Sequence, residues 1–166
     1  MVGTWDNKDQ VYGFAALNIV SGQLSTRLLE QPARSQAQTG RSKAQRLQVA
    51  FATHLKDIAQ AYPAHTYPEV VITIDNASWH GGALVRQVLE AHAHLYVKRL
   101  PSYSPQLNVI ERFWRVLRRR ATHNRLFTDM AALRATLRNN ICYFQTMRHK
   151  MLSLIESPRK TKKMQS

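Results

Sequence analysis

Apolar and polar positions along the first third of the chain follow two different periods. The runs VYGFAALNIV (residues 11–20) and QLSTRLLE (residues 23–30) are apolar and β-prone, and they flank Ser21-Gly22. This pattern predicts a β-hairpin with the glycine in its turn. Apolar residues then recur at helical spacing from Ser42 to Tyr62, and Pro63 should end that helix. The apolar positions of this helix are Leu47, Phe51, Leu55 and Ile58.

The rest of the chain alternates strands and helices. EVVITID (residues 69–75) is a continuous apolar run of the buried-strand type, and HLYVKRL (residues 94–100) predicts a second short strand. Helices are predicted from about Ala83 to His92, from Asn108 to about Arg120, and from Asp129 to about Met151. An alternation of this kind predicts an α/β fold, in which helices pack on a mixed sheet.

Charge is distributed unevenly along the sequence. The formal net charge is +14, and 17 of the 24 Lys and Arg residues, but only 4 of the 10 Asp and Glu residues, follow residue 83. Such asymmetry indicates a polyanionic partner and favours nucleic acid. A solvated basic surface, or a basic tail on anionic lipid, is the alternative. Nucleic acid is favoured because the arginines accompany structured motifs.

The sequence also bears on location and on the single cysteine. It has no apolar run of 18 residues and no secretory signal at its N-terminus, which predicts a cytoplasmic protein that is not anchored in a membrane. No motif for a small-molecule cofactor is found. Cys142 has no second thiol to pair with, so we expect it to be a small buried residue on a helix.

Asp75 ends the apolar strand VVITI, where its backbone is buried and its carboxylate can reach the rim of the sheet. Ligands and reaction sites of open α/β sheets lie outside the carboxyl ends of the strands. The alternative is an aspartate that caps the following turn through a side-chain oxygen, an arrangement common in loops. From Asp75 alone, the turn cap is the simpler interpretation.

Glu111 is the one acid on a strongly basic helix. It could reach back to an N-cap at Asn108, or pair with Arg115 four residues later. Neither explains its surroundings, because Glu111 shares a helix face with Arg115, Arg118 and Arg119. A carboxylate among phosphate-binding arginines is suited to carry a cation. Two carboxylates from different elements near a nucleic-acid backbone are the oxygen ligands that Mg²⁺ prefers.

Two motifs carry a resemblance to a known family. VVITIDNASWHGG, followed by VKRLPSYSPQLNVIERFWRVLRR, resembles the DDE-type transposases of the IS630/Tc1/mariner superfamily, with 35 residues between Asp75 and Glu111. The resemblance implies a ribonuclease H-like catalytic domain for DNA transposition, with metal-dependent DNA cleavage and strand transfer at transposon ends. DNA is then the partner, and a homodimer is compatible with the family.

The resemblance also implies roles for individual residues. Asp75 and Glu111 would be the catalytic metal ligands for Mg²⁺ or Mn²⁺. The DNA-phosphate contacts would come from the helix that carries Glu111, namely from Arg112, Arg115, Arg118 and Arg119. His80 matches the family's histidine and would line the site; the alternative is a histidine beside the start of the helix that follows Gly82. Tyr103 and Ser104 lie in the loop before the helix with Glu111, where they either line the site or shape the turn between Pro101 and Pro105. When bound to DNA, the protein would associate with the bacterial nucleoid.

The sequence departs from the family at its N-terminus. The family uses a third acid, an aspartate that ends a first, central strand, and only Asp6 and Asp9 precede the hairpin here. We therefore expect residues 1–152 to form a partial, truncated catalytic domain lacking that strand, and residues 153–166 to form a basic disordered tail. The alternative function is a catalytically inactive transposase remnant that acts as a non-specific DNA-binding protein.

Overall fold

A β-hairpin lies at the centre of the computed structural model, which describes residues 10–31, 40–102 and 108–156. β1 (Gln10–Leu17) pairs antiparallel with β2 (Leu24–Gln31), with Leu17 opposite Leu24. In the turn, Gly22 has a φ of 69°, a conformation that side chains with a Cβ rarely adopt. The predicted hairpin and its turn glycine are confirmed.

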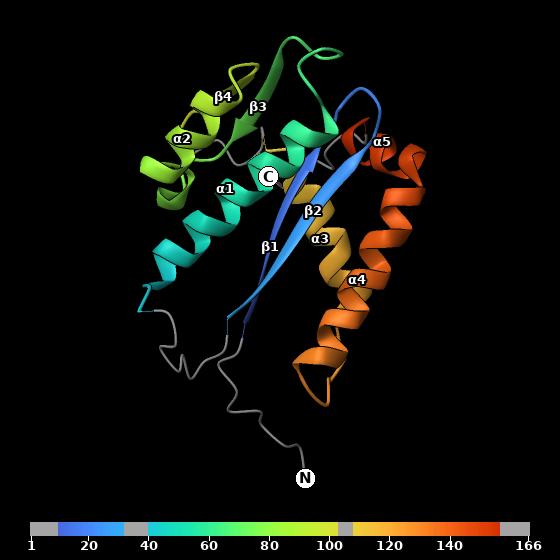
Figure 1. The fold of residues 1–166 in the computed structure, drawn as a ribbon. Helices are drawn as coiled ribbons and strands as arrows, with labels where there is room; N and C mark the ends of the chain where they lie inside the picture. Colours follow the sequence, from blue (N-terminus) through green and yellow to red (C-terminus); the bar gives the residue numbers. More distant parts are fainter. Residues whose placement is uncertain (1–9, 32–39, 103–107, 157–166) are drawn as a thin grey trace, which may run out of the picture.

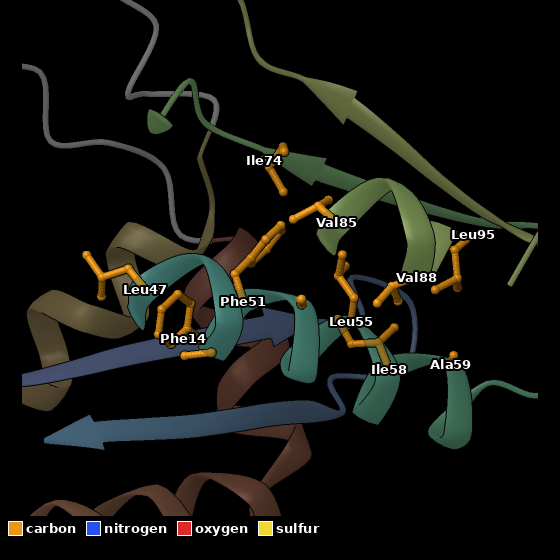
Figure 2. Packing of buried hydrophobic residues seen from close by; sticks show 12 residues of the cluster. Phe14, Leu47, Phe51, Leu55, Ile58, Ala59, Ile74, Val85, Val88 and Leu95 are labelled. Atoms are coloured by element: carbon orange, nitrogen blue, oxygen red, sulfur yellow. The ribbon is translucent and has the colours of Figure 1, made fainter. Parts of the chain in front are cut away.

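One face of the hairpin is covered by α1 (Lys43–Ala61). Ser42 and Gln45 form a capping box at its start, and Tyr62 is its C-cap, directly before the proline. Its apolar stripe lies between Phe14 of the hairpin and the elements on its other side (Figure 2). The helix therefore carries the first core, whose largest members are Phe14, Leu47, Phe51, Leu55, Ile58, Ile74, Val85, Val88 and Leu95.

On the far side of α1 lies a strand–helix–strand unit (Figure 1). β3 (Val70–Ile74) pairs in parallel with β4 (Leu95–Arg99), and a short 3₁₀ turn, η1 (Ser78–His80), and α2 (Ala83–Ala91) connect them. The sequence predicted a strand of the buried type, but β3 is buried on one face only. Val71 of β3 and its partner Tyr96 of β4 are 55% and 53% exposed, because α1 and α2 cover only the opposite face.

The strands of the described residues form two separate sheets of two strands each, β1–β2 and β3–β4. The sequence had predicted a mixed sheet without its first, central strand. Within the described chain, no ladder joins β1 to β3, and the two sheets are held together by side chains that both contribute to the core on α1. Residues 1–9, which precede β1, lie outside the described residues.

Three helices cover the other face of the hairpin (Figure 1). They are α3 (Ile110–Ala121), α4 (Met130–Thr146) and α5 (Arg148–Glu156). α4 starts next to Asp129, where the helix was predicted to begin, and Asp129 caps it, with its carboxylate accepting from the Ala132 N–H at 2.7 Å. A second core fills the space between these helices and the hairpin, and it contains Leu24, Phe113, Leu117, Ala121, Ile141, Phe144 and Met151.

The single helix predicted from Asp129 to Met151 is in fact two helices that meet at Met147. A continuous helix would extend the stripe of Ile141 and Phe144 to Arg148 and bury a charge. The break leaves Arg148 exposed and still buries Met151 completely. Cys142 lies beside the stripe and is exposed, so its predicted burial is wrong.

The last described helix spans the boundary expected at residue 152. α5 continues to Glu156, and the basic segment 157–166 lies outside the described residues. In the part of the chain that the structure describes, no helix combines the length and the apolarity needed to cross a membrane.

Candidate metal and nucleic-acid site

Asp75 directly follows β3, at the carboxyl end of the parallel pair. Two hydrogen bonds hold the strand ends together: the Leu100 N–H donates to Ile74 O at 2.8 Å, and the Asn76 side-chain amide donates to Leu100 O at 2.9 Å. The side chain of Asp75 is 51% exposed at this rim. Asn76 is a residue that sequence reasoning missed, although its place beside Asp75 in the motif was visible.

The carboxylate of Asp75 makes two local contacts, both through Oδ1. It accepts a hydrogen bond from the Ala77 N–H at 3.0 Å, which is the turn cap weighed as the alternative interpretation. It also lies 3.0 Å from Nδ1 of His80. Since a carboxylate can only accept, Nδ1 of His80 carries the proton in this contact. The cap and the histidine both use one oxygen, so they fix the carboxylate without using Oδ2.

His80 is packed into the wall of the site. Its side chain is 13% exposed, and its ring lies 4.3 Å from that of Phe51 on α1, measured between centroids. Burial lowers the pKa of His80 from its ordinary value, Asp75 opposes that shift, and Arg99 adds to it. Arg99, at the end of β4, also donates to His80 O at 3.5 Å. Sequence reasoning missed Arg99 as a residue near the site. The signal that could have indicated it is the parallel pairing of the two strands, which places Arg99 opposite Ile74.

Glu111 occupies the first turn of α3, and its side chain is 45% exposed. The predicted cap at Asn108 is wrong: the helix begins at Ile110, and Val109 holds the N-cap position without a side-chain hydrogen bond. Glu111 lies 4.0 Å from the guanidinium of Arg118, which is 70% exposed. An ion pair this long and this exposed contributes little to stability. The carboxylate is therefore not committed to a structural role by that contact.

The four arginines predicted to bind phosphate fall into two groups. Arg115, Arg118 and Arg119 are exposed on α3. Arg112 instead donates hydrogen bonds to Leu154 O at 2.8 Å and Ile155 O at 2.7 Å, and so caps the last turn of α5. Tyr103 and Ser104, predicted to line the site, lie outside the described residues.

Comparisons with known proteins identify the family of the chain. The model of the DDE superfamily endonucleases matches residues 33–134, a segment that contains both Asp75 and Glu111. The chain belongs to the DDE superfamily endonucleases. A search of curated protein sequences found no match. The DDE family indicated by the two sequence motifs is thereby confirmed.

Solved structures of a mariner transposase share the fold. The crystal structure of the Mos1 mariner transposase catalytic domain superposes with a TM-score of 0.54 and 18% identity, and the match covers 88% of this chain and 78% of that one. The Mos1 catalytic domain with raltegravir and Mg matches with the same TM-score and 17% identity, over 89% and 79% of the two chains. The predicted ribonuclease H-like fold is confirmed.

Membership of this family implies the use of a divalent metal. The donors available at the site fit a hard cation in kind, because Asp75 and Glu111 offer exposed carboxylate oxygens. They fall short in number: the described residues contain no group of three His, Cys, Asp or Glu side chains that could hold a metal ion.

Proposed function

We propose that this chain is a transposase catalytic domain for DNA transposition, in which Asp75 and Glu111 hold Mg²⁺ or Mn²⁺ during DNA cleavage and strand transfer at transposon ends. The observation that carries the proposal is that the DDE match spans both acids, and both have exposed carboxylates. The Mos1 catalytic domain with Mg supports the choice of metal. When bound, the ion supplies Lewis acid stabilisation of the phosphodiester oxygens.

The residues around the two acids have separate roles in this proposal. His80 fixes the orientation of Asp75 through Oδ1 and, because its pKa is lowered, stays neutral near pH 7. A neutral histidine adds no positive charge that would repel a metal ion from Asp75. Arg115, Arg118 and Arg119 bind DNA phosphates beside Glu111, as exposed cations do on nucleic-acid-binding surfaces.

Metal binding is the direct test of these assignments. We expect Mn²⁺, followed by electron paramagnetic resonance, to bind the 166-residue protein weakly, with binding lost in Asp75→Asn and in Glu111→Gln. Glu90→Gln, a charge-matched change of an exposed acid on α2, should leave the titration unchanged. Equal loss of Mn²⁺ binding in all three variants would indicate a general charge effect and would contradict the assignment.

A second candidate function is a DNA-binding protein without catalytic activity. It is favoured by one observation, the lack of a three-residue metal-binding group among the described residues. The 166-residue chain alone is then expected to bind DNA without nicking supercoiled plasmid in Mg²⁺ or Mn²⁺. Nicking that depends on metal and disappears in both Asp75→Asn and Glu111→Gln would reject this candidate. The third ligand would then be sought at Asp6 and Asp9.

A further inference from the structure

A cluster of two cations around one tyrosine lies where α3, α4 and α5 meet. The guanidinium carbon of Arg120 is 4.1 Å from the ring centroid of Tyr143, and Nζ of Lys150 is 4.8 Å from the same centroid. The Lys150 ammonium also donates a hydrogen bond to the Tyr143 hydroxyl. Arg120, Tyr143 and Lys150, called here the tyrosine cluster, come from three different helices.

The ring of Tyr143 is held in place by the second core, so the cluster has a fixed centre. Its centroid lies 5.3 Å from that of Phe144, and Phe144 in turn packs edge-on against Phe113 at 5.6 Å. Phe113 and Phe144 are both buried. The two cations therefore converge on a platform that the fold has already ordered, which lowers the entropy lost when a ligand binds.

The cluster carries positive charge without a compensating acid. None of the ion pairs in the described part of the chain involves Arg120 or Lys150. Both side chains are exposed. The two cations lower the pKa of Tyr143, mainly through the hydrogen bond from Lys150, and Arg120 adds to that shift. Two like charges beside one hydroxyl create a local preference for an anion.

The cluster lies on a different flank of α3 from the arginines near Glu111. Arg118 and Arg120 are two positions apart, which is about 200° around a helix. Accordingly, Arg118 approaches Glu111 whereas Arg120 lies over Tyr143 of α4. A nucleic acid that contacted only the face with Glu111 would leave the tyrosine cluster unused.

We propose that Arg120, Tyr143 and Lys150 form a second phosphate-binding site, which holds a DNA backbone phosphate away from the Asp75 and Glu111 site. The inference rests on the proposed DNA substrate. Arg120 supplies a planar donor fork, Lys150 supplies a mobile ammonium, and the phosphate competes with the Tyr143 hydroxyl for the Lys150 protons. The surrounding charge favours a polyanion such as DNA, since most of the basic residues lie in this half of the chain.

The first test measures the salt dependence of binding to a fluorescent DNA duplex. In Arg120→Gln/Lys150→Gln, the slope of log affinity against log salt should become shallower by about 0.9, because the contact with one phosphate is lost. Lys56→Gln/Arg86→Gln is the charge-matched control, because both residues are exposed on other helices. Equal changes in the two double variants would show that only net charge matters, and an unchanged slope in the first would reject the site.

A second readout localises the contact. Cys142 is the only cysteine of the sequence, is exposed, and precedes Tyr143 on α4. DNA should slow its modification by the neutral reagent N-ethylmaleimide, and this protection should disappear in Arg120→Gln/Lys150→Gln but persist in Lys56→Gln/Arg86→Gln. Protection by polyglutamate and not by DNA would assign the cluster to an acidic protein segment and overturn the proposal.

The failure of this proposal can be separated from the failure of the proposed function. Arg115→Gln/Arg119→Gln should weaken DNA binding whether or not the tyrosine cluster is a site. If that variant lowers affinity while Arg120→Gln/Lys150→Gln changes neither the slope nor the protection, only the second site is rejected. If the unmodified protein shows no salt-sensitive DNA binding, the proposed DNA substrate and the second site are both rejected.

Discussion

At the scale of single residues, His54 on α1 is the most unusual group in the molecule. It is 2% exposed, and neither ring nitrogen has a hydrogen-bond partner among the described residues. Its Nδ1 lies 3.9 Å from Asp57, which is held by a bidentate pair with Arg27. Burial lowers the pKa of His54 to about 4, Asp57 opposes this shift, and Arg27 adds to it.

This histidine should make the protein sensitive to acid. Below its ordinary pKa of 6.5 the unfolded chain binds a proton that the folded chain excludes until about pH 4. The part of the free energy of unfolding that depends on neutral His54 is therefore fully present above pH 6.5. As the pH falls from 6.5 to 4, this part is lost, and the free energy of unfolding decreases by about 3 kcal/mol. Urea unfolding of His54→Leu should show a smaller loss over this interval. His65→Leu, in the exposed turn after α1, is the control, and a loss equal to wild type in His54→Leu would contradict the assignment.

At the scale of elements, the arginines of α3 are divided between folding and binding. Arg112 fastens the end of α5 through two carbonyl oxygens, whereas Arg115, one turn later, is exposed. Charged donors at a helix C-terminus satisfy carbonyls that have no partner within the helix. Neutralising Arg112 or Arg115 changes the net charge by the same amount. A comparison of the two variants therefore separates a role in folding from a role in DNA binding.

Arg112→Gln should therefore lower the free energy of unfolding by about 2 kcal/mol, since hydrogen bonds to a charged group are lost at a partly buried site. Arg115→Gln should leave the free energy of unfolding within about 0.5 kcal/mol of wild type and weaken DNA binding. Chemical denaturation and fluorescence anisotropy of the two variants provide the measurements. A weaker DNA complex in both, with unchanged stability in both, would mean that Arg112 contacts DNA as the sequence had suggested.

The packing of α3 on β1 depends on a glycine. A Cβ built at Gly13 would lie 2.4 Å from Cη2 of Trp114, so the indole occupies the space that a side chain would need. Gly13→Ala should destabilise the protein by about 1–3 kcal/mol, which is typical of overpacking. Adding Trp114→Leu should recover part of that loss in a double-mutant cycle. Additive losses in thermal unfolding would show that the indole is not the obstacle.

At the scale of the whole molecule, charge and catalytic chemistry should be separable. With most of its positive charge in the C-terminal half, the protein should bind duplexes of unrelated sequence with similar affinity. Each neutralised phosphate contributes about −0.9 to the slope of log affinity against log salt. Glu111→Gln should bind DNA slightly more tightly, because one negative charge is removed from the arginine face. A marked loss of affinity in Glu111→Gln, measured by fluorescence anisotropy, would contradict this separation.

Most of the elements, the family and the candidate acids could be inferred from the order of residues alone. The hairpin with its turn at Gly22 and the bounds of α1 follow from local periodicity, and the motifs around Asp75 and Glu111 are contiguous in the chain. Such features depend on neighbouring residues and can therefore be read without knowing the fold.

How those elements meet depends on the folded arrangement. The division into two sheets, the break at Met147 and the exposure of Cys142 depend on which faces are covered by distant elements. The cap that Arg112 provides for α5 and the cluster around Tyr143 join residues from separate helices. Their sequence separations carry no periodic signal, because side-chain packing and long-range electrostatics arise only once the chain has folded.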